Sequence, residues 1–297
     1  MARLRRRKIG NKHYYYLEHS YKTGNAVKTI SRYLGIKKPE SVKDLKKEIE
    51  YEAMRRIWGK TLSEIQKGYA KELRELPNAA RDKRIESFMV NFIFNSNKIE
   101  GSKLSFRDTA GLFIHGITPK NKPLKDVKEA EGHKKAFFDM LEYKGSFDLK
   151  KIISWHKAIF ENSEPDIAGK IRLHKIEVTG SRASFPHPES INRLLSEFFL
   201  WYHKTKRMFN PVEFAALAHL KFVSIHPFTD GNGRISRLLT NYVLYRNNYP
   251  LINIKYLDRM GYYRSLETSQ IWYDEIHFVR FFVKKYINAN KKYITNT

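Results

Sequence analysis

The chain has 297 residues, 41% of them hydrophobic, which is enough for a large folded core and excludes a wholly disordered protein. It contains no cysteine, which excludes disulfides, thiol nucleophiles and cysteine-ligated zinc, and which suits a cytoplasmic protein. No run of about 18 apolar residues occurs, and the basic N-terminus lacks an apolar segment, so we expect neither a membrane partner nor a signal peptide.

Residues 1–40 are expected to form a separate basic, aromatic β-hairpin element. Two tyrosine-rich, β-favouring runs flank the turn-type residues Lys22-Thr-Gly-Asn25. The formal net charge of the whole chain is +25, which favours polyanionic partners or reflects no more than a solvated lysine surface. Because basic residues alternate with tyrosines here, this element is a candidate for binding nucleic acid; a solvated docking hairpin explains the same pattern.

Beyond residue 40 the pattern is helical. Residues 41–80 are expected to be a helical linker region, and residues 81–290 a larger helical domain. Helices of that domain are expected near 81–95, 106–115, 124–143, 149–160, 191–204, 211–224, 238–245, 262–272 and 276–287. The runs 168–172 and 175–179, followed by Gly180 and two prolines, predict one short β-hairpin. The fold class is therefore all-α with minor hairpins.

The stretch Ser224-Ile-His-Pro-Phe-Thr-Asp-Gly-Asn-Gly-Arg-Ile-Ser-Arg237 holds most of the candidate chemistry. Gly231, Asn232 and Gly233 precede a helix, where backbone N–H groups can bind a phosphate. Arg234 and Arg237 are neighbours on the first turn of that helix and can bind one oligophosphate at two points. Asp230 is suited to holding Mg²⁺ against phosphate oxygens, and His226 to accepting a proton from a hydroxyl.

Each of these features also has an ordinary structural explanation. A histidine after an apolar helix is often structural, and Gly-Asn-Gly is often only a turn. His226 and Asp230 could form a metal pair, but no third ligand follows at a suitable spacing. Taken together in one short stretch, they favour a catalytic phosphate site.

A weaker pattern lies upstream, at Ser96, Glu100 and Gly101. Four residues place Ser96 and Glu100 on one helix face, and Gly101 is a natural helix stop. A carboxylate in the last helical turn is disfavoured by the helix dipole unless it has a cationic partner. Taken alone, this pattern favours a plain surface glutamate over a functional one.

His226 to Arg237 resembles the motif of Fic-domain proteins, HxFx(D/E)GNGRxxR, at every defined position. The resemblance extends over about residues 81–287, with a Fic core at about 124–287, and implies a Fic-type helical bundle with a small β-hairpin flap. Most members of that family are protein adenylyltransferases, which transfer AMP from ATP to a hydroxyl of a target protein. The resemblance implies Mg²⁺ or Mn²⁺ as cofactor, ATP as substrate, and protein targets that include the chain itself.

By the same resemblance, each residue of the motif has a role. His226 deprotonates the target Ser, Thr or Tyr, and Asp230 holds the metal. Asn232 and the amides of Gly231 and Gly233 bind the α-phosphate, Arg234 the β-phosphate and Arg237 the γ-phosphate. The resemblance also implies that the nucleotide base lies against a wall formed by Tyr262, Tyr263, Leu266 and Gln270. It further implies a flap that docks the target, formed by Ile176, Glu177, Val178 and Thr179.

Ser96, Glu100 and Gly101 are similar to the inhibitory motif of the family, (S/T)xxxE(G/N). The resemblance implies that Glu100 pairs with Arg237 and takes it from the γ-phosphate. Several alternatives stay open: removal of AMP by the same site, UMP or GMP as the transferred group, and a homodimer. In a rival hypothesis, the basic N-terminal element makes the chain a nucleic-acid-binding regulator, and the Fic core is a nucleotide sensor.

Overall fold

A computed structural model of the chain describes residues 2–23, 26–177, 180 and 182–294. The chain divides into two compact units, one up to Ile65 and the other over Gln66–Tyr293. The boundary falls within the long helix α1 (Lys43–Glu75). No helix in the described ranges combines the length and the apolar run that crossing a bilayer requires.

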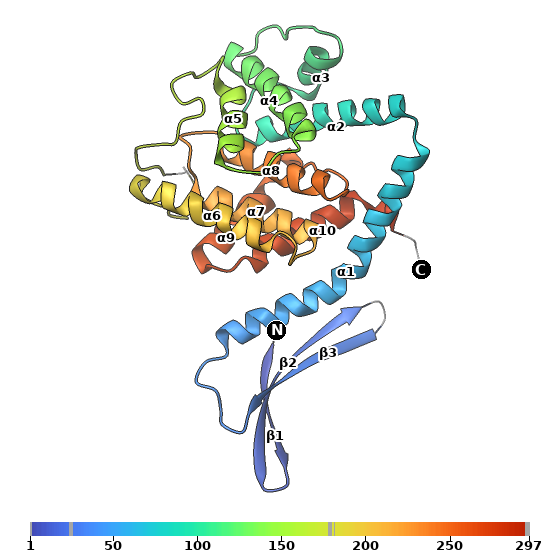
Figure 1. Ribbon diagram of the computed structural model, residues 1–297, viewed down its shortest axis with the longest axis vertical. Coiled ribbons are helices and arrows are strands. Elements are labelled where there is room, and N and C mark those ends of the chain that lie inside the picture. Colours follow the sequence, from blue (N-terminus) through green and yellow to red (C-terminus); the bar gives the residue numbers. More distant parts are fainter. Residues whose placement is uncertain (1, 24–25, 178–179, 181, 295–297) are drawn as a thin grey trace. The chain divides into compact units, whose positions relative to one another are not determined.

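The first unit contains a three-stranded antiparallel sheet in the order β1-β2-β3 (Figure 1). Strand β2 (Lys12–Thr23) pairs with β3 (Ala26–Gly35), which confirms the expected hairpin. Strand β1 (Arg3–Ile9) was not expected, because four arginines and a lysine in seven residues give little β-forming signal. It is joined to β2 through Gly10, whose positive φ of 61° suits a tight connection.

One side of this sheet forms the core of the first unit. Leu17, Tyr21 and Ile30 have side chains on the same face and are buried with Ile49 and Ala53 of α1. Leu17 and Ile49 are fully buried. The hydrophobic effect therefore fixes which face of the sheet is inward, since a shift of one residue in register would reverse every side chain.

The second unit is helical, as the sequence predicted. Its α-helices are α2 (Asn78–Ile99), α3 (Phe106–Ile114), α4 (Leu124–Glu142), α5 (Leu149–Phe160), α6 (Ile191–Thr205), α7 (Pro211–Ile225), α8 (Asn232–Arg246), α9 (Arg259–Trp272) and α10 (Ile276–Ala289). Several begin at residues that the sequence marks as helix starts. Ser105 and Asp108 form a capping box before α3, and the Asp148 side chain caps α5.

Helices α7 and α8 form the centre of this unit (Figure 1). Helix α7 is apolar on nearly all sides and packs against α6, α8 and α10, whereas α8 also contacts α2, α4 and α5. The two helices are joined by the short loop that carries His226 and Asp230. The most buried helix pair of the unit therefore fixes both ends of the loop.

The β-hairpin flap expected at 168–179 does not form among the described residues. The segment is irregular, and its one β-type pairing is an isolated bridge between Ile171 and Phe228. The Arg172 guanidinium donates to the backbone carbonyls of His174 and Pro186, both at 2.7 Å, so side-chain contacts and not a hairpin ladder hold this segment. Val178 and Thr179 lie outside the described residues.

Candidate active site

The loop between α7 and α8 is held in one conformation by its own side chains. Asn232 Oδ1 accepts from the Phe228 N–H at 2.9 Å, and Asn232 Nδ2 donates to the Phe228 carbonyl at 2.8 Å. Gly231 has a φ of 82°, and a Cβ there would collide with the Phe160 ring. The Asn232 side chain is thus committed to the loop, which leaves its backbone N–H as the donor for a ligand.

His156 of α5 also holds this loop in place. Its Nδ1 accepts from the Gly169 N–H at 2.9 Å, so its Nε2 carries the proton and donates to the Asp230 carbonyl at 3.0 Å. The ring stacks on Phe228 with centroids 3.8 Å apart. Burial lowers the pKa of His156 to about 4, which keeps the ring neutral and this arrangement intact at pH 7.

His226 closes α7 in the left-handed region, with φ 52° and ψ 57°. Its Nδ1 lies 3.2 Å from the Val223 carbonyl, which fixes the proton on Nδ1 and leaves the lone pair on Nε2. Burial lowers the pKa of His226 to about 4. The imidazole is therefore neutral at pH 7, the state that a proton acceptor requires.

The N-terminus of α8 supplies the anion-binding groups. The N–H groups of Asn232, Gly233 and Arg234 stand in the first turn, where a helix offers them no backbone acceptor. The Glu100 carboxylate lies directly over this turn: it is so close that a Cβ on residue 233 would collide with Glu100 Oε1. An acidic side chain thus stands where a helix N-terminus attracts anions.

Arg237 is 2% exposed and binds the end of α2 through several donors. Its Nη2 forms an ion pair with Glu100 Oε1 at 2.6 Å and donates to the Ser96 carbonyl at 3.0 Å. Its Nε donates to Ser96 Oγ at 2.9 Å, and its Nη1 lies 3.4 Å from the Tyr262 hydroxyl. Arg237 is therefore the cationic partner that a carboxylate in the last turn of a helix requires. Gly101 follows Glu100 with a φ of 99° and ends α2.

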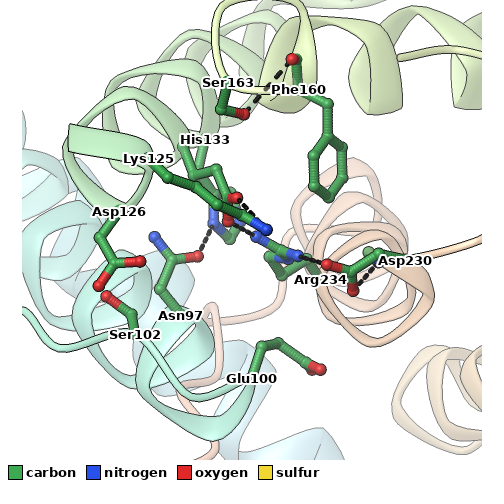
Figure 2. A network of polar contacts seen from close by, with 12 residues as sticks. Asn97, Glu100, Ser102, Lys125, Asp126, His133, Phe160, Ser163, Asp230 and Arg234 are labelled. Carbon is green, nitrogen blue, oxygen red and sulfur yellow. Dashed lines mark hydrogen bonds and ion pairs between the residues drawn. The ribbon is translucent and has the colours of Figure 1, made fainter. Parts of the chain in front are cut away.

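Arg234 has two acidic partners, one of which, Asp230, is labelled in Figure 2. Its Nη1 forms a short ion pair with Glu129 of α4, and its Nη2 binds Asp230 Oδ2 at 2.9 Å. The guanidinium also lies over the Phe160 ring, 4.5 Å from the centroid. Burial acts to raise the pKa of Asp230, but the charge of Arg234 and the hydrogen bonds from Gly231 N–H and Arg234 together outweigh it. The pKa is therefore lowered and the carboxylate stays ionised.

A second polar link joins α2 to α4. Asn97 Oδ1 lies 3.0 Å from Nδ1 of the buried His133 (Figure 2). His133 stands one turn after Glu129 on α4, so it shares a helix face with the residue that binds Arg234. Asn97 Nδ2, His133 Nε2 and Arg234 Nε are buried without a hydrogen-bond partner among the described residues. Such atoms cost about 1–3 kcal/mol each in proteins unless water or a ligand satisfies them.

His226, Asp230, Glu100 and the Gly231–Gly233 turn line one cavity of about 550 Å³. The same cavity is lined by the four residues predicted to form the base wall, Tyr262, Tyr263, Leu266 and Gln270. Tyr262 is fully buried and its hydroxyl bonds His219 Nε2 at 2.8 Å, whereas Tyr263 is 43% exposed. Ile176 and Glu177 lie in irregular backbone and are not among the described lining residues.

Asp230 is the one candidate in the motif for holding a divalent cation. Its side chain is 43% exposed. Oδ1 accepts a hydrogen bond from Gly231 N–H and Oδ2 binds Arg234, so lone pairs remain on both oxygens. No group of three or more histidine or carboxylate side chains suited to a metal occurs within the described ranges. One carboxylate beside a polyphosphate is the usual protein contribution to bound Mg²⁺, so the residues present fit that ion.

The sequence alone missed four contributors to this site. Three of them, Glu129, His156 and Arg172, each bind a motif residue directly. The fourth is the Asn97–His133 pair, which joins α2 and α4, the helices whose acidic residues bind Arg237 and Arg234. Arg172 Nε donates to the His226 carbonyl at 2.8 Å. One signal was available, since Glu129 and His133 lie on the apolar stripe of α4 that continues through Ala136 and Met140.

The fold and the site define an all-α protein with a neutral histidine beside an anion-binding helix N-terminus. Residues 146–244 match the model of the Fic/DOC family. Over 211 residues the chain is 31% identical to protein adenylyltransferase Fic of Nematostella vectensis, covering 69% of this chain and 48% of that relative. Over 209 residues it is 29% identical to protein adenylyltransferase fic-1 of Caenorhabditis elegans, covering 68% and 41%. The chain thus spans about half the length, or less, of these curated relatives.

Solved structures agree with the family match. A Fic-domain-containing signaling protein from Bacteroides thetaiotaomicron superposes with a TM-score of 0.71 at 26% identity, covering 78% of this chain and 95% of that one. Fic-1 of C. elegans gives a TM-score of 0.69 at 25% identity, covering 86% and 77%. The chain therefore contains a Fic domain of the Fic/DOC family, as the motif led us to expect.

Proposed function

We propose that the chain is a protein adenylyltransferase that transfers AMP from ATP to a Ser, Thr or Tyr hydroxyl of a target protein. The observation that supports this most directly is the neutral His226 imidazole in the cavity that also contains the N-terminus of α8. The names of the matched relatives support the same activity. They do not favour the rival hypothesis of a nucleic-acid regulator with a non-catalytic core.

In the proposed reaction, the target hydroxyl oxygen attacks the α-phosphorus of ATP. His226 Nε2 takes the hydroxyl proton, the new P–O bond forms to the target, and the bond to the bridging α–β oxygen breaks with release of pyrophosphate. The lone pair on Nε2 follows from the Nδ1 contact with the Val223 carbonyl. Positioning and neutralisation of charge would supply most of the rate, as in phosphoryl transfer generally.

The phosphates would bind along the first turn of α8. The N–H groups of Asn232 and Gly233 would hold the α-phosphate, and Arg234 and Arg237 the β- and γ-phosphates. Asp230 would hold Mg²⁺ or Mn²⁺, which neutralises phosphate charge when bound. The adenine would lie against Tyr263 and the other cavity residues of α9, and the target backbone against the segment that follows Arg172.

We also propose that Glu100 inhibits the enzyme by competing with the γ-phosphate for Arg237. The carboxylate binds the guanidinium at 2.6 Å and overlies Gly233, so a phosphate and Glu100 cannot occupy this position together. ATP that binds without Arg237 would be misaligned for in-line attack. The same carboxylate could activate water to remove AMP from a modified target, which release of AMP from a labelled, purified substrate would test.

Incubation with ATP labelled on the α-phosphate and Mg²⁺ tests the proposal. The Glu100→Gly variant should incorporate label into itself or a target, and the Glu100→Gly, His226→Ala double variant should not, while both bind ATP with similar affinity. Label from GTP or UTP in place of ATP would identify a different transferred nucleotide. Undiminished incorporation by the double variant would rule out His226 as the base.

A further inference from the structure

The three-stranded sheet of the first unit has a second face, which the α1 helix does not cover. Residues directly opposite each other in paired antiparallel strands share a face, and neighbours along a strand alternate. Leu17, Tyr21 and Ile30 point toward α1. The alternate residues therefore form what we call the outer face: Arg3, Arg5, Arg7, Tyr14, Tyr16 and Tyr33.

Three tyrosines lie side by side on the outer face. The Tyr16 and Tyr33 rings have centroids 5.3 Å apart, and Tyr14 and Tyr33 are 6.1 Å apart. Tyr33 is 52% exposed and lies on the face opposite the core, so it does not contribute to that core. These rings, of which Tyr33 is exposed and Tyr14 and Tyr16 are half-buried, offer π-faces to planar ligands, because unpaired bases stack on aromatic side chains.

Arginines of β1 flank these rings. The register places Arg5 opposite Tyr16 and Arg7 opposite Tyr14, and the Arg7 guanidinium lies 4.6 Å from the Tyr16 centroid. Arg5 and Arg7 are both exposed and share one carboxylate, Glu18, which is the sole acidic residue in the three strands. One carboxylate cannot neutralise two arginines, so this side of the sheet keeps an excess of positive charge.

The net charge of residues 1–40 also favours an anionic ligand. Residues 1–40 contain eleven Lys and Arg and two Asp and Glu, a net charge of +9 out of +25 for the chain. About a third of the net charge is therefore concentrated in the first 40 residues. This density attracts a polyanion, and stacking rings among the cations select one that carries exposed aromatic bases.

We propose that the outer face binds single-stranded nucleic acid, with bases stacked on Tyr14, Tyr16 and Tyr33 and phosphates bound by the β1 arginines. A duplex hides its bases from such a surface, so single strands should be preferred. The proposal does not depend on the transferase reaction, because all of its residues belong to the first unit.

Alternation along the strands supplies matched controls for its test. The 297-residue chain is titrated into a fluorescent single strand of about 12 nucleotides, as RNA and as DNA, and into the matching duplex, with anisotropy measured over a series of salt concentrations. Tyr16→Leu changes the outer face, and Tyr15→Leu changes the neighbouring residue on the opposite face. Arg5→Gln and Arg6→Gln form a second pair, with equal loss of charge on opposite faces.

We expect Tyr16→Leu and Tyr33→Leu to raise Kd for the single strand about five-fold or more, with Tyr33→Phe restoring it. Arg5→Gln should lower the slope of log K against log salt by about 0.7, and Arg6→Gln should leave it nearly unchanged. Equal losses in the two members of either pair would overturn the proposal, as would a duplex that binds as tightly as the single strand. Absence of binding at low salt by a folded protein would also overturn it.

Discussion

Replacing Glu100 by glycine should raise AMP transfer and lower the stability of the free enzyme. The substitution removes the carboxylate that lies 2.6 Å from a guanidinium that is only 2% exposed. A charge-assisted hydrogen bond contributes about 1.5–3 kcal/mol, and the Glu100 side chain is 23% exposed, so we place this one near 1.5–2 kcal/mol. If ATP must displace that contact, the variant should bind ATP productively about 10- to 30-fold better.

The same contact stabilises the folded protein, so the effect on stability has the opposite sign. Arg237 keeps its bonds to Ser96 and Tyr262, which limits the loss to about the same 1.5–2 kcal/mol and to a fall in Tm of about 3 to 8 °C. ATP should raise the Tm of the variant by more than it raises the Tm of the unchanged protein, because it supplies the missing anion.

The assay measures incorporation of labelled AMP and Tm with and without ATP. Glu100→Gln is the matched variant, since it keeps the size of the side chain and removes its charge, and its activation should be intermediate. Equal incorporation by the unchanged protein and Glu100→Gly would refute the competition for Arg237. An unchanged Tm would show that the ion pair contributes little, and the magnitude above would then be wrong.

Three further outcomes are expected. Glu129→Gln should lower the free energy of unfolding by about 2–3 kcal/mol, somewhat less than a fully broken buried pair, because Arg234 keeps a second carboxylate; chemical denaturation measures this, and a change below about 0.5 kcal/mol would contradict it. Gly231→Ala should weaken ATP binding and destabilise the fold, whereas Gly59→Ala in α1, which meets open space, should be neutral or stabilising; similar effects in both would show that φ and the close contact at 231 are unimportant. The His226 ring should titrate in NMR spectra with a pKa of about 4, so that its signals stay constant from pH 8 to about 5 and shift only below that; titration near the usual value of about 6.5 would mean that burial does not set its charge.

The motif and the helices could be predicted because their signals are local. Spacing along one stretch placed His226, Asp230 and both arginines together, and apolar periodicity with capping residues gave the helices of the second unit. Ser96 and Glu100 also met Arg237 as expected, although 137 residues separate Glu100 from Arg237. Here the family motif supplied the long-range information that periodicity cannot.

What the sequence did not predict depends on tertiary contacts. The family resemblance gave Asn232 a role in binding the α-phosphate, but its side chain is used to close the loop on Phe228. Arg172 lies in what looks like a strand, but its guanidinium binds the backbone carbonyls of His226, His174 and Pro186, and the expected flap hairpin does not form among the described residues. Local propensity contains no information on such partners, since they depend on where distant backbone lies after folding.

The last turn of α2 binds Arg237 directly and is linked to α4, the helix whose Glu129 binds Arg234. Glu100 binds Arg237 directly, and Asn97 binds His133, one turn from the Glu129 that binds Arg234. A displacement of this turn would therefore free the Arg237 guanidinium, whereas Arg234 would keep its bonds to Glu129 and Asp230. Under the proposed function, a signal that relieves the inhibition would need to act on only a few residues at the end of one helix, and it would prepare the two arginines unequally for the nucleotide.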